Sequence, residues 1–415
     1  MNEPEFSRLI LAMVALVTAA LGSGYVFQRL GMPRVIGEIV GGIVLGPSVL
    51  GVLSPQLFDW LFRASAVQMT GLEAIYWIGL VLLMFTSGFR VQRSLTTDDR
   101  RTIVVILVAA TALPFVLGYA APAVIDLGHL MGSAGNPESF RLVMGIAVAV
   151  TSIPVIAKIF LDLGIMETRF AKIVLGCATL QDLALWTVLA VATGLAAGAG
   201  DGSPWALVQT IAVTLAFLAF SIWLAPRALP SVSRFRFNLL SKASPIGYTL
   251  TICFLFTALA SVLGVNAIFG ALVAGLAVGA LPDIRFADVR NRIADVSLGF
   301  FVPIYFALVG LKIDLPGYFD PWTTVAFIGL SSVVEVACVF VVARLIGRPP
   351  LTSFNLGMAM NTRGGPGIVL ASVAFAAGII NETFFVTLVL AALLTSLASG
   401  VWFRLLVRRG LPLYE

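Results

Sequence analysis

The chain has 415 residues, of which 59% are hydrophobic and 11% charged, and its mean hydropathy is +1.02. Soluble domains carry about 25% charged residues, so this composition excludes a soluble globular protein and indicates one that crosses a membrane many times. The net charge of +5 is spread over short loops, which argues against a nucleic-acid partner.

A helix needs about 20 apolar residues to cross a bilayer, and thirteen segments of the chain reach or approach that length. They are 6–29, 34–52, 72–91, 101–125, 139–161, 168–198, 204–226, 244–263, 266–281, 292–311, 321–345, 352–378 and 383–408. The sequence therefore predicts an all-α polytopic membrane protein with about thirteen transmembrane helices. We expect no cleaved leader before the first helix and no soluble regulatory domain after the last one.

The distribution of basic residues supports this number of helices. If alternate loops are assigned to the cytoplasm, starting after the first helix, 21 of the 26 Lys and Arg residues lie inside and four lie outside. Cytoplasmic loops of membrane proteins carry such an excess of basic residues. We therefore expect the N-terminus outside and the C-terminus in the cytoplasm, with the protein in a bacterial inner membrane.

Two of the expected helices, 139–161 and 352–378, contain helix breakers near the middle of the membrane. The first reads TSIPV from Thr151, and the second reads NTRGGPG from Asn361. Proline removes a backbone donor, and exposed backbone at this depth is tolerated only inside protein or beside a polar cavity. Each broken helix is the middle of a triplet, and the two triplets have opposite orientations. Such inverted repeats are typical of secondary transporters, although Gly and Pro are also simply frequent in membrane helices.

Three ionisable residues lie too deep to reach an interface. Asp182 and Glu335 are each fourteen residues into their expected helices, which is roughly 21 Å along the axis, and Arg363 lies in the second break. Intramembrane carboxylates are costly and indicate function. A carboxylate such as Asp182 can hold a proton or a cation, and that competition is sufficient for antiport. The alternative for Asp182 is an internal hydrogen bond or ion pair between helices.

Neutral oxygen ligands for an alkali cation are available near these carboxylates. The expected donors are Gln181, which precedes Asp182, and the hydroxyls of Thr151 and Ser152 in the first break. The chain offers few residues for a metal site or for histidine-based catalysis, because it has three cysteines in apolar runs and one histidine. We expect no cofactor and no enzymatic activity. A passive channel, a membrane enzyme and a carrier of an organic solute are the alternatives.

Five stretches resemble signatures of the monovalent cation:proton antiporter-2 family. They are Met32–Gly51, Gly79–Gly88, Thr151–Gly164, Phe300–Leu315 and Met360–Leu370, in the order in which they occur in that family. The resemblance implies exchange of K⁺ or Na⁺ for H⁺ by an elevator-type movement in a homodimer. It also implies a core, ion-translocating domain at about 72–199 and 321–408 and a scaffold or dimerisation domain at about 1–71 and 200–320.

The resemblance assigns roles residue by residue. Gln181-Asp182 matches the family's ion-site pair, in a form similar to the potassium-efflux branch, where exchange is thought to be electroneutral. Thr151 and Ser152 match the unwound stretch of the first crossing helix. The residues Asn361, Thr362 and Arg363 match that of the second, as crossing-helix support.

Glu335 departs from the family pattern, because many members carry a lysine at the corresponding depth. Three interpretations stay open. Glu335 is a second carboxylate of the ion site, or it pairs with Arg363, or it marks a changed substrate such as an organic cation.

Overall fold

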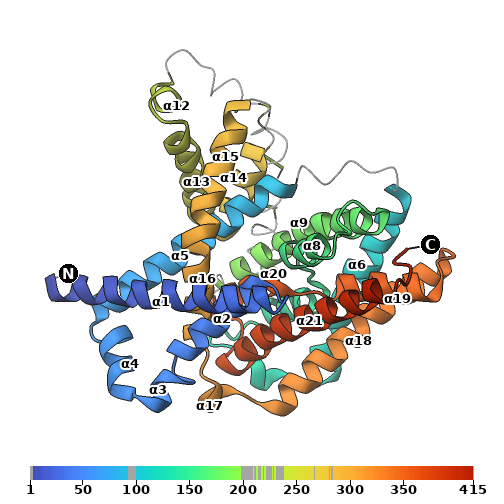
Figure 1. Cartoon of the computed structure of the whole chain (residues 1–415), viewed down its shortest axis with the longest axis horizontal. Coiled ribbons are helices and arrows are strands. Elements are labelled where there is room, and N and C mark those ends of the chain that lie inside the picture. The colour runs from blue at the N-terminus through green and yellow to red at the C-terminus, as the bar shows by residue number, and fades with distance from the viewer. Residues whose placement is uncertain are drawn as a thin grey trace. The chain divides into compact units, whose positions relative to one another are not determined.

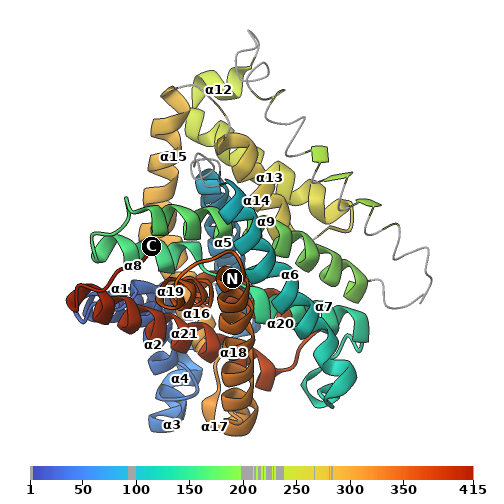
Figure 2. The same ribbon diagram turned by 90° about the vertical axis from the view of Figure 1, so that its right-hand side faces the viewer.

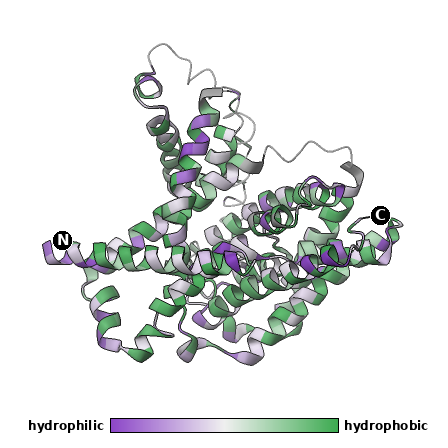
Figure 3. Ribbon diagram, viewed as in Figure 1, coloured by the Kyte–Doolittle hydropathy of each residue, from purple (hydrophilic) through white to green (hydrophobic). Residues whose placement is uncertain are grey.

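The computed structural model describes residues 3–91, 100–197 and 238–414 except 266, 280, 282 and 283, with isolated residues between 209 and 229. The described residues are almost entirely helical, with one isolated bridge between Met131 and Ile380. Nine of the helices in these ranges are long and apolar enough to cross a membrane, and hydrophobic residues dominate them (Figure 3). The predicted all-α polytopic fold is confirmed.

The chain divides into two compact units. Unit 1 comprises Met1–Leu30, Arg34–Arg93 and Gln209–Gly317, and unit 2 comprises Gly31–Pro33, Ser94–Val208 and Tyr318–Glu415. The described helices of unit 1 are α1 (Glu3–Arg29), α2 (Arg34–Leu45), α3 (Leu50–Leu53), α4 (Pro55–Phe62), α5 (Ala66–Val91), α12 (Leu239–Ala243), α13 (Pro245–Val262), α14 (Ala267–Gly279), α15 (Ile284–Val296), the π-helical turn η3 (Ser297–Phe301) and α16 (Val302–Leu311). The short helix α17 (Leu315–Tyr318) ends at the first residue of the last segment of unit 2.

Unit 2 contains both broken helices. Its elements are α6 (Arg100–Val124), the 3₁₀ turn η1 (Gly128–Leu130), α7 (Pro137–Ala149), α8 (Ile153–Asp162), α9 (Arg169–Ala197), α18 (Pro321–Leu345), α19 (Pro350–Met360), α20 (Gly364–Ala376) and α21 (Glu382–Arg408). The helix predicted at 139–161 is split into α7 and α8, and the one at 352–378 into α19 and α20. The other predicted segments coincide with described helices, except 204–226, which lies largely outside the described residues.

The two units differ from the expected core and scaffold domains at one helix. The segment 72–91 was expected in the core domain, whereas α5 belongs to unit 1. The reason is close backbone packing between α5 and α14. A Cβ atom added at Gly275 would collide with the backbone carbonyl of Phe85, and one added at Gly88 would lie 2.5 Å from the carbonyl oxygen of Leu272. Small residues allow such an approach between membrane helices.

The interior of unit 2 is apolar on one side of the breaks. Phe160 of α8, Phe170 of α9 and Phe403 of α21 pack against one another with ring centroids 5.6–5.7 Å apart. They belong to a buried cluster drawn from α6, α8, α9, α18, α19 and α21. Helices α18, α19 and α21 lie side by side (Figures 1 and 2). This packing fixes the helices that carry the polar residues of the breaks.

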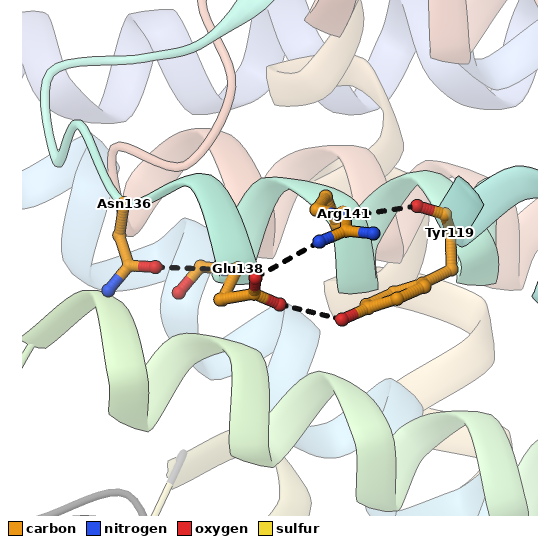
Figure 4. Close-up of polar contacts among 5 residues, drawn as sticks. Tyr119, Asn136, Glu138 and Arg141 are labelled. Carbon is orange, nitrogen blue, oxygen red and sulfur yellow. Dashed lines mark hydrogen bonds and ion pairs between the residues drawn. The ribbon is translucent and has the colours of Figure 1, made fainter. Parts of the chain in front are cut away.

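Polar contacts fix the start of α7 to its neighbours. The Tyr119 hydroxyl of α6 donates to Glu138 Oε2 (2.7 Å), and Arg141 Nη1 binds Glu138 Oε1 at 3.1 Å (Figure 4). The Arg141 Nε donates to the backbone carbonyl of Tyr119 at 3.3 Å. Asn136 caps α7, and its Nδ2 donates to the Leu195 carbonyl of α9 at 3.2 Å. The half-helix that leads to the first break is therefore held by both α6 and α9.

Candidate ion-binding site

The first break follows from the residues around Thr151. Val150 and Ser152 have extended backbone angles, so the α-helical hydrogen bonds of α7 end with the one that the Val150 N–H donates to the Ile146 carbonyl at 2.9 Å. Helix α8 then restarts with the Ser152 side chain as its N-cap, accepting from the Val155 N–H at 3.4 Å. Proline is favoured in a first helical turn, where its missing N–H is not needed, and Pro154 occupies that turn.

The second break follows from glycine. Helix α19 ends at Met360, with Asn361 as its C-cap, and α20 begins at Gly364. Gly364 has a φ angle of +39°, a conformation that side chains disfavour. A Cβ added there would lie 2.5 Å from Ser152 Oγ and would collide with Val155. The two breaks therefore cross at the position where only glycine leaves enough space.

Hydrogen bonds join the two breaks directly. The Ser152 N–H donates to the Thr362 carbonyl at 2.5 Å, and the Thr151 hydroxyl donates to the Met360 carbonyl at 2.5 Å. Arg363 Nη2 donates to the carbonyl of Val148 at 3.3 Å. These bonds satisfy backbone groups that the breaks free, which is necessary in a membrane. The predicted crossing of the two broken helices is thus present in the structure.

Helix α21 supplies a third set of contacts, which the sequence analysis missed. The Thr395 hydroxyl accepts from the Arg363 N–H at 3.3 Å, and the Ser396 hydroxyl accepts from the Gly364 N–H at 3.2 Å. Both hydroxyls also donate to carbonyls of their own helix. They cap the start of α20 from a neighbouring helix. The signal in the sequence was the pair of adjacent hydroxyl residues, Thr395 and Ser396, within a largely apolar helix.

Gln181 lies at the first break with its amide group fixed. Its Nε2 donates to the Ala110 carbonyl of α6 at 2.7 Å and to the Ala149 carbonyl of α7 at 2.6 Å. Both amide hydrogens are therefore in use, and the Oε1 atom is buried without a hydrogen-bond partner. If the amide were rotated by half a turn, its oxygen would face two carbonyl oxygens and could not bond to them. The two hydrogen bonds therefore set the orientation of the Gln181 amide. The result is a positioned neutral oxygen.

Asp182 follows Gln181 on α9, about 20 Å from the start of that helix. The side chain is half-buried, and its Oδ1 atom is buried without a hydrogen-bond partner. Buried polar atoms are normally satisfied, so an unpartnered one requires an explanation such as a bound ion or water. Neighbouring carboxylate and amide oxygens are hard ligands of the kind that alkali cations prefer.

Glu335 is fully buried on α18, and both of its carboxylate oxygens lack a hydrogen-bond partner. The charged group that acts on it electrostatically is Arg363, which is 2% exposed and has an unpartnered Nε and Nη1. Among the described residues, no hydrogen bond or electrostatic interaction joins Glu335 to Asp182. The structure thus places Glu335 with the second break.

The remaining predicted site residues lie at the crossing. Thr151, Ser152, Thr362 and Asn361 are all buried, and Asn361 has a side-chain oxygen without a hydrogen-bond partner. The hydroxyls of Thr151 and Ser152 hold backbone groups, yet a hydroxyl oxygen has two lone pairs. Their role as cation ligands stays a prediction.

The family model described as "Sodium/hydrogen exchanger, transmembrane" matches residues 14–409. The chain belongs to this family. The matched residues cover most of both units.

Two curated relatives are similar over most of the chain. Cation/H(+) antiporter 20 of Arabidopsis thaliana is 29% identical over 94% of this chain and 47% of its own length. Na(+)/H(+) antiporter NhaS4 of Synechocystis sp. is 27% identical over 94% of this chain and 95% of its own length. The chain therefore spans about half the length of the plant relative and nearly all of the cyanobacterial one.

A solved structure of the sodium proton antiporter MjNhaP1 from Methanocaldococcus jannaschii at pH 8 has the same fold. The TM-score is 0.68 at 17% sequence identity, and the match covers 97% of this chain and 98% of that one. The similarity at this identity concerns the fold. The shared fold agrees with the polytopic helical architecture described above.

Proposed function

We propose that this protein is a secondary active antiporter that exchanges a monovalent cation, K⁺ or Na⁺, for H⁺. The observation that carries the proposal is the pair of unpartnered oxygens, Gln181 Oε1 and Asp182 Oδ1, beside a crossing of two broken helices. Membership of the sodium/hydrogen exchanger family and the names of the two relatives support the same activity.

In the proposed mechanism Asp182 binds a proton and a cation in turn. A protonated carboxyl group is neutral, whereas a carboxylate needs a cation to offset its charge in a membrane. The empty, charged carboxylate is costly to move, so the site crosses only when it is occupied. Gln181 adds a neutral oxygen, so a single carboxylate titrates in the site. One proton is then exchanged for one monovalent cation, and transport is electroneutral.

Glu335 and Arg363 form, in this proposal, an ion pair that supports the second break. Breaking a buried ion pair by removing one partner costs about 3–5 kcal/mol because the other charge is left uncompensated. The electrostatic influence of Arg363 on the buried Glu335 carboxylate supports this role over that of a second cation ligand. A second carboxylate at the site would be expected to interact with Asp182.

At the level of domains, we propose that unit 2 carries the ion and moves against unit 1 in an elevator-type cycle. Unit 2 contains both breaks and all the candidate ligands. Unit 1 would then serve as the scaffold, and as the dimerisation surface of a homodimer in a bacterial inner membrane. The N-terminus would face outward and the C-terminus the cytoplasm, as the basic residues indicate.

The deciding experiment measures proton flux in proteoliposomes driven in turn by Na⁺, K⁺ and Li⁺ gradients, with the membrane potential clamped and unclamped. We expect Asp182→Asn to abolish flux while the protein stays folded, because an amide binds neither a proton nor a cation tightly. Electroneutral exchange predicts the same rate with and without the clamp. Normal flux in Asp182→Asn would remove the assignment of the ion site.

Glu335→Gln separates the two roles of that residue in the same assay. If Glu335 only pairs with Arg363, the variant loses thermal stability, while the cation concentration for half-maximal rate and its pH dependence stay unchanged. A shifted cation dependence with unchanged stability would identify Glu335 as a ligand instead.

A further inference from the structure

A groove of about 710 Å³ runs along the side of unit 2 between α18, α19 and α21. Its lining is apolar over almost its whole length, with Phe340 and Val333 on α18, Phe354 and Met358 on α19, and Leu394 on α21. Val333 is 66% exposed and Leu394 48% exposed, so the groove is open at the side of the unit. The groove is separate from the Asp182 site.

The surroundings of this groove limit what fills it. Helices α18 and α21 are two of the long apolar helices, and an open groove on such helices faces the acyl chains of a bilayer. An apolar groove of this kind does not hold ordered water, which needs two to four polar partners. A flexible hydrocarbon chain therefore suits the lining.

A positive charge at one end of the groove favours a negatively charged headgroup. Arg344, in the last turn of α18, lies three and four residues after Val341 and Phe340, which line the groove, and so lies on the same helix face. Its side chain is exposed, and its Nη1 donates to the Arg348 carbonyl at 2.6 Å. Between residues 336 and 414 the only acidic residue is Glu382, at the opposite end of α21.

We propose that the groove and Arg344 together bind an anionic phospholipid, with an acyl chain between α18, α19 and α21 and the phosphate at the guanidinium. Arginine binds phosphate by charge-assisted hydrogen bonds, and basic positions at the cytoplasmic ends of membrane helices attract anionic lipids. The lipid is identified by its chemistry, a single negative charge above a long apolar chain.

A lipid chain in this groove lies beside residues of the second break. The inner part of the groove is lined by Asn361, the C-cap of α19, and by Thr395, which accepts from the Arg363 N–H. A chain packed there restrains residues that hold the crossing. Resting on the proposed exchange activity, the inference adds that anionic lipid changes the exchange rate.

The binding test uses the purified full chain in detergent and follows its thermal unfolding as phosphatidylglycerol or phosphatidylcholine is added. We expect phosphatidylglycerol to stabilise the protein at lower concentration. Arg344→Gln should weaken its apparent affinity about fivefold, which corresponds to ~1 kcal/mol for one arginine near a membrane surface. Arg409→Gln, just beyond α21 and outside the groove, is the matched control and should keep the wild-type response.

A second variant tests the groove without touching the charge. Ala337 lines the groove and is exposed, so Ala337→Trp fills the space where the chain would lie and should abolish the preference for phosphatidylglycerol. Inorganic phosphate should give no shift, because the acyl chain is part of the ligand. Equal stabilisation by both lipids, or an unchanged response in both variants, would overturn the proposal.

The functional arm compares proton flux in vesicles of phosphatidylcholine with and without phosphatidylglycerol. We expect phosphatidylglycerol to change the wild-type rate and to leave the rate of Ala337→Trp unaffected. Absence of any flux in the wild type would contradict the exchange activity, while the thermal assay would still decide whether the lipid binds.

Discussion

At the scale of single residues, Gly364 shows how little space the crossing of the broken helices leaves. Its φ angle is +39°, and an added Cβ would lie 2.5 Å from Ser152 Oγ. We predict that Gly364→Ala lowers the free energy of unfolding by about 2–5 kcal/mol, because it combines backbone strain with overpacking. Thermal unfolding and proton flux should both report the loss.

Gly329→Ala is the matched control for that substitution. Gly329 lies inside α18, is exposed, and has open space where a Cβ would be added. Alanine there should stabilise the protein by about 0.5–1 kcal/mol, because glycine is unfavourable within a helix. Equal effects of the two substitutions would show that the crossing is not tightly packed.

Gln181 makes a second prediction at this scale, since its two hydrogen bonds hold carbonyls of α6 and α7. Gln181→Met keeps the length of the side chain but leaves both carbonyls unpaired. Each unpaired buried group costs about 1–3 kcal/mol, so thermal stability should fall, and the cation concentration for half-maximal flux should rise with the loss of Oε1.

Gln68→Met in unit 1 separates stability from cation binding. Gln68 is buried, and its Nε2 donates to the Leu61 carbonyl at 2.5 Å. Its loss should lower thermal stability while the cation dependence of flux stays as in the wild type. If both glutamine variants shift the cation dependence equally, the shift reflects general destabilisation.

The residue types of the candidate site were predicted from the sequence, whereas their partners were not. Asp182 and Glu335 stand out because a carboxylate in an apolar run is rare. That Gln181 bonds to the carbonyls of Ala110 and Ala149 depends on how α6, α7 and α9 pack, which the sequence does not show. The pairing of Glu335 with Arg363 stays one of three alternatives from the sequence, because the depth of a residue in the membrane does not fix the direction of its side chain.

At the scale of elements, the N-cap residue of α18 is Asp320, which is ionisable. Asp320 accepts a hydrogen bond from the Thr323 hydroxyl (2.5 Å), which is the main cause that lowers its pKa below the ordinary value of 3.8. The Trp322 N–H, at 3.0 Å from Oδ1, and the nearby His129 act in the same direction. A carboxyl group whose pKa is lowered by folding stabilises the folded state at pH values above its ordinary pKa.

That stabilisation is lost as the pH falls through the lowered pKa of Asp320. Asp320→Asn keeps a good N-cap without a charge, so we predict that the wild type unfolds at a higher temperature than the variant at about pH 6. The difference should shrink below about pH 4 and disappear at lower pH. A difference that stays constant down to about pH 2.5 would show that the charge of Asp320 does not stabilise the helix.

Helix positions were predictable, because hydropathy and breakers act locally. The breaks at Thr151 and Asn361 were found from Pro154 and the glycines after Arg363. The caps that Thr395 and Ser396 provide for α20 were not, since they join residues about thirty positions apart whose helices must first pack. The same limit applies to α5, which lies in unit 1, because the sequence does not show which helices pack at their glycines; whether α5 moves with the core domain stays a prediction.

At the scale of the whole molecule, the elevator proposal predicts that each unit moves as a body. Spin-label pairs are placed at exposed sites, Met69 with Leu259 in unit 1 and Leu113 with Val401 in unit 2, after replacement of the three native cysteines. We expect the distance within each pair to stay the same when the cation gradient and pH are reversed. The distance between Met69 and Leu113 should change.

The same labels test the assignment of α5, because Met69 lies on that helix. If α5 moves with unit 1, the distance from Met69 to Leu259 is constant through the cycle. A change in that distance, with a constant distance from Met69 to Leu113, would place α5 in the ion-carrying part, where the sequence analysis expected the segment 72–91 of that helix.

By itself the sequence determined the membrane-spanning helical fold, the two breaks and the identity of the buried carboxylates. These depend on apolar length, helix breakers and the rarity of charge, which are properties of short segments. Only the tertiary structure decided which atoms are satisfied and which are left free. The oxygens of Gln181 and Asp182 lack partners because α6, α7 and α9 pack in one particular way. The buried carboxylate of Glu335 comes within the electrostatic influence of Arg363 because α18 packs against α19 of the second break.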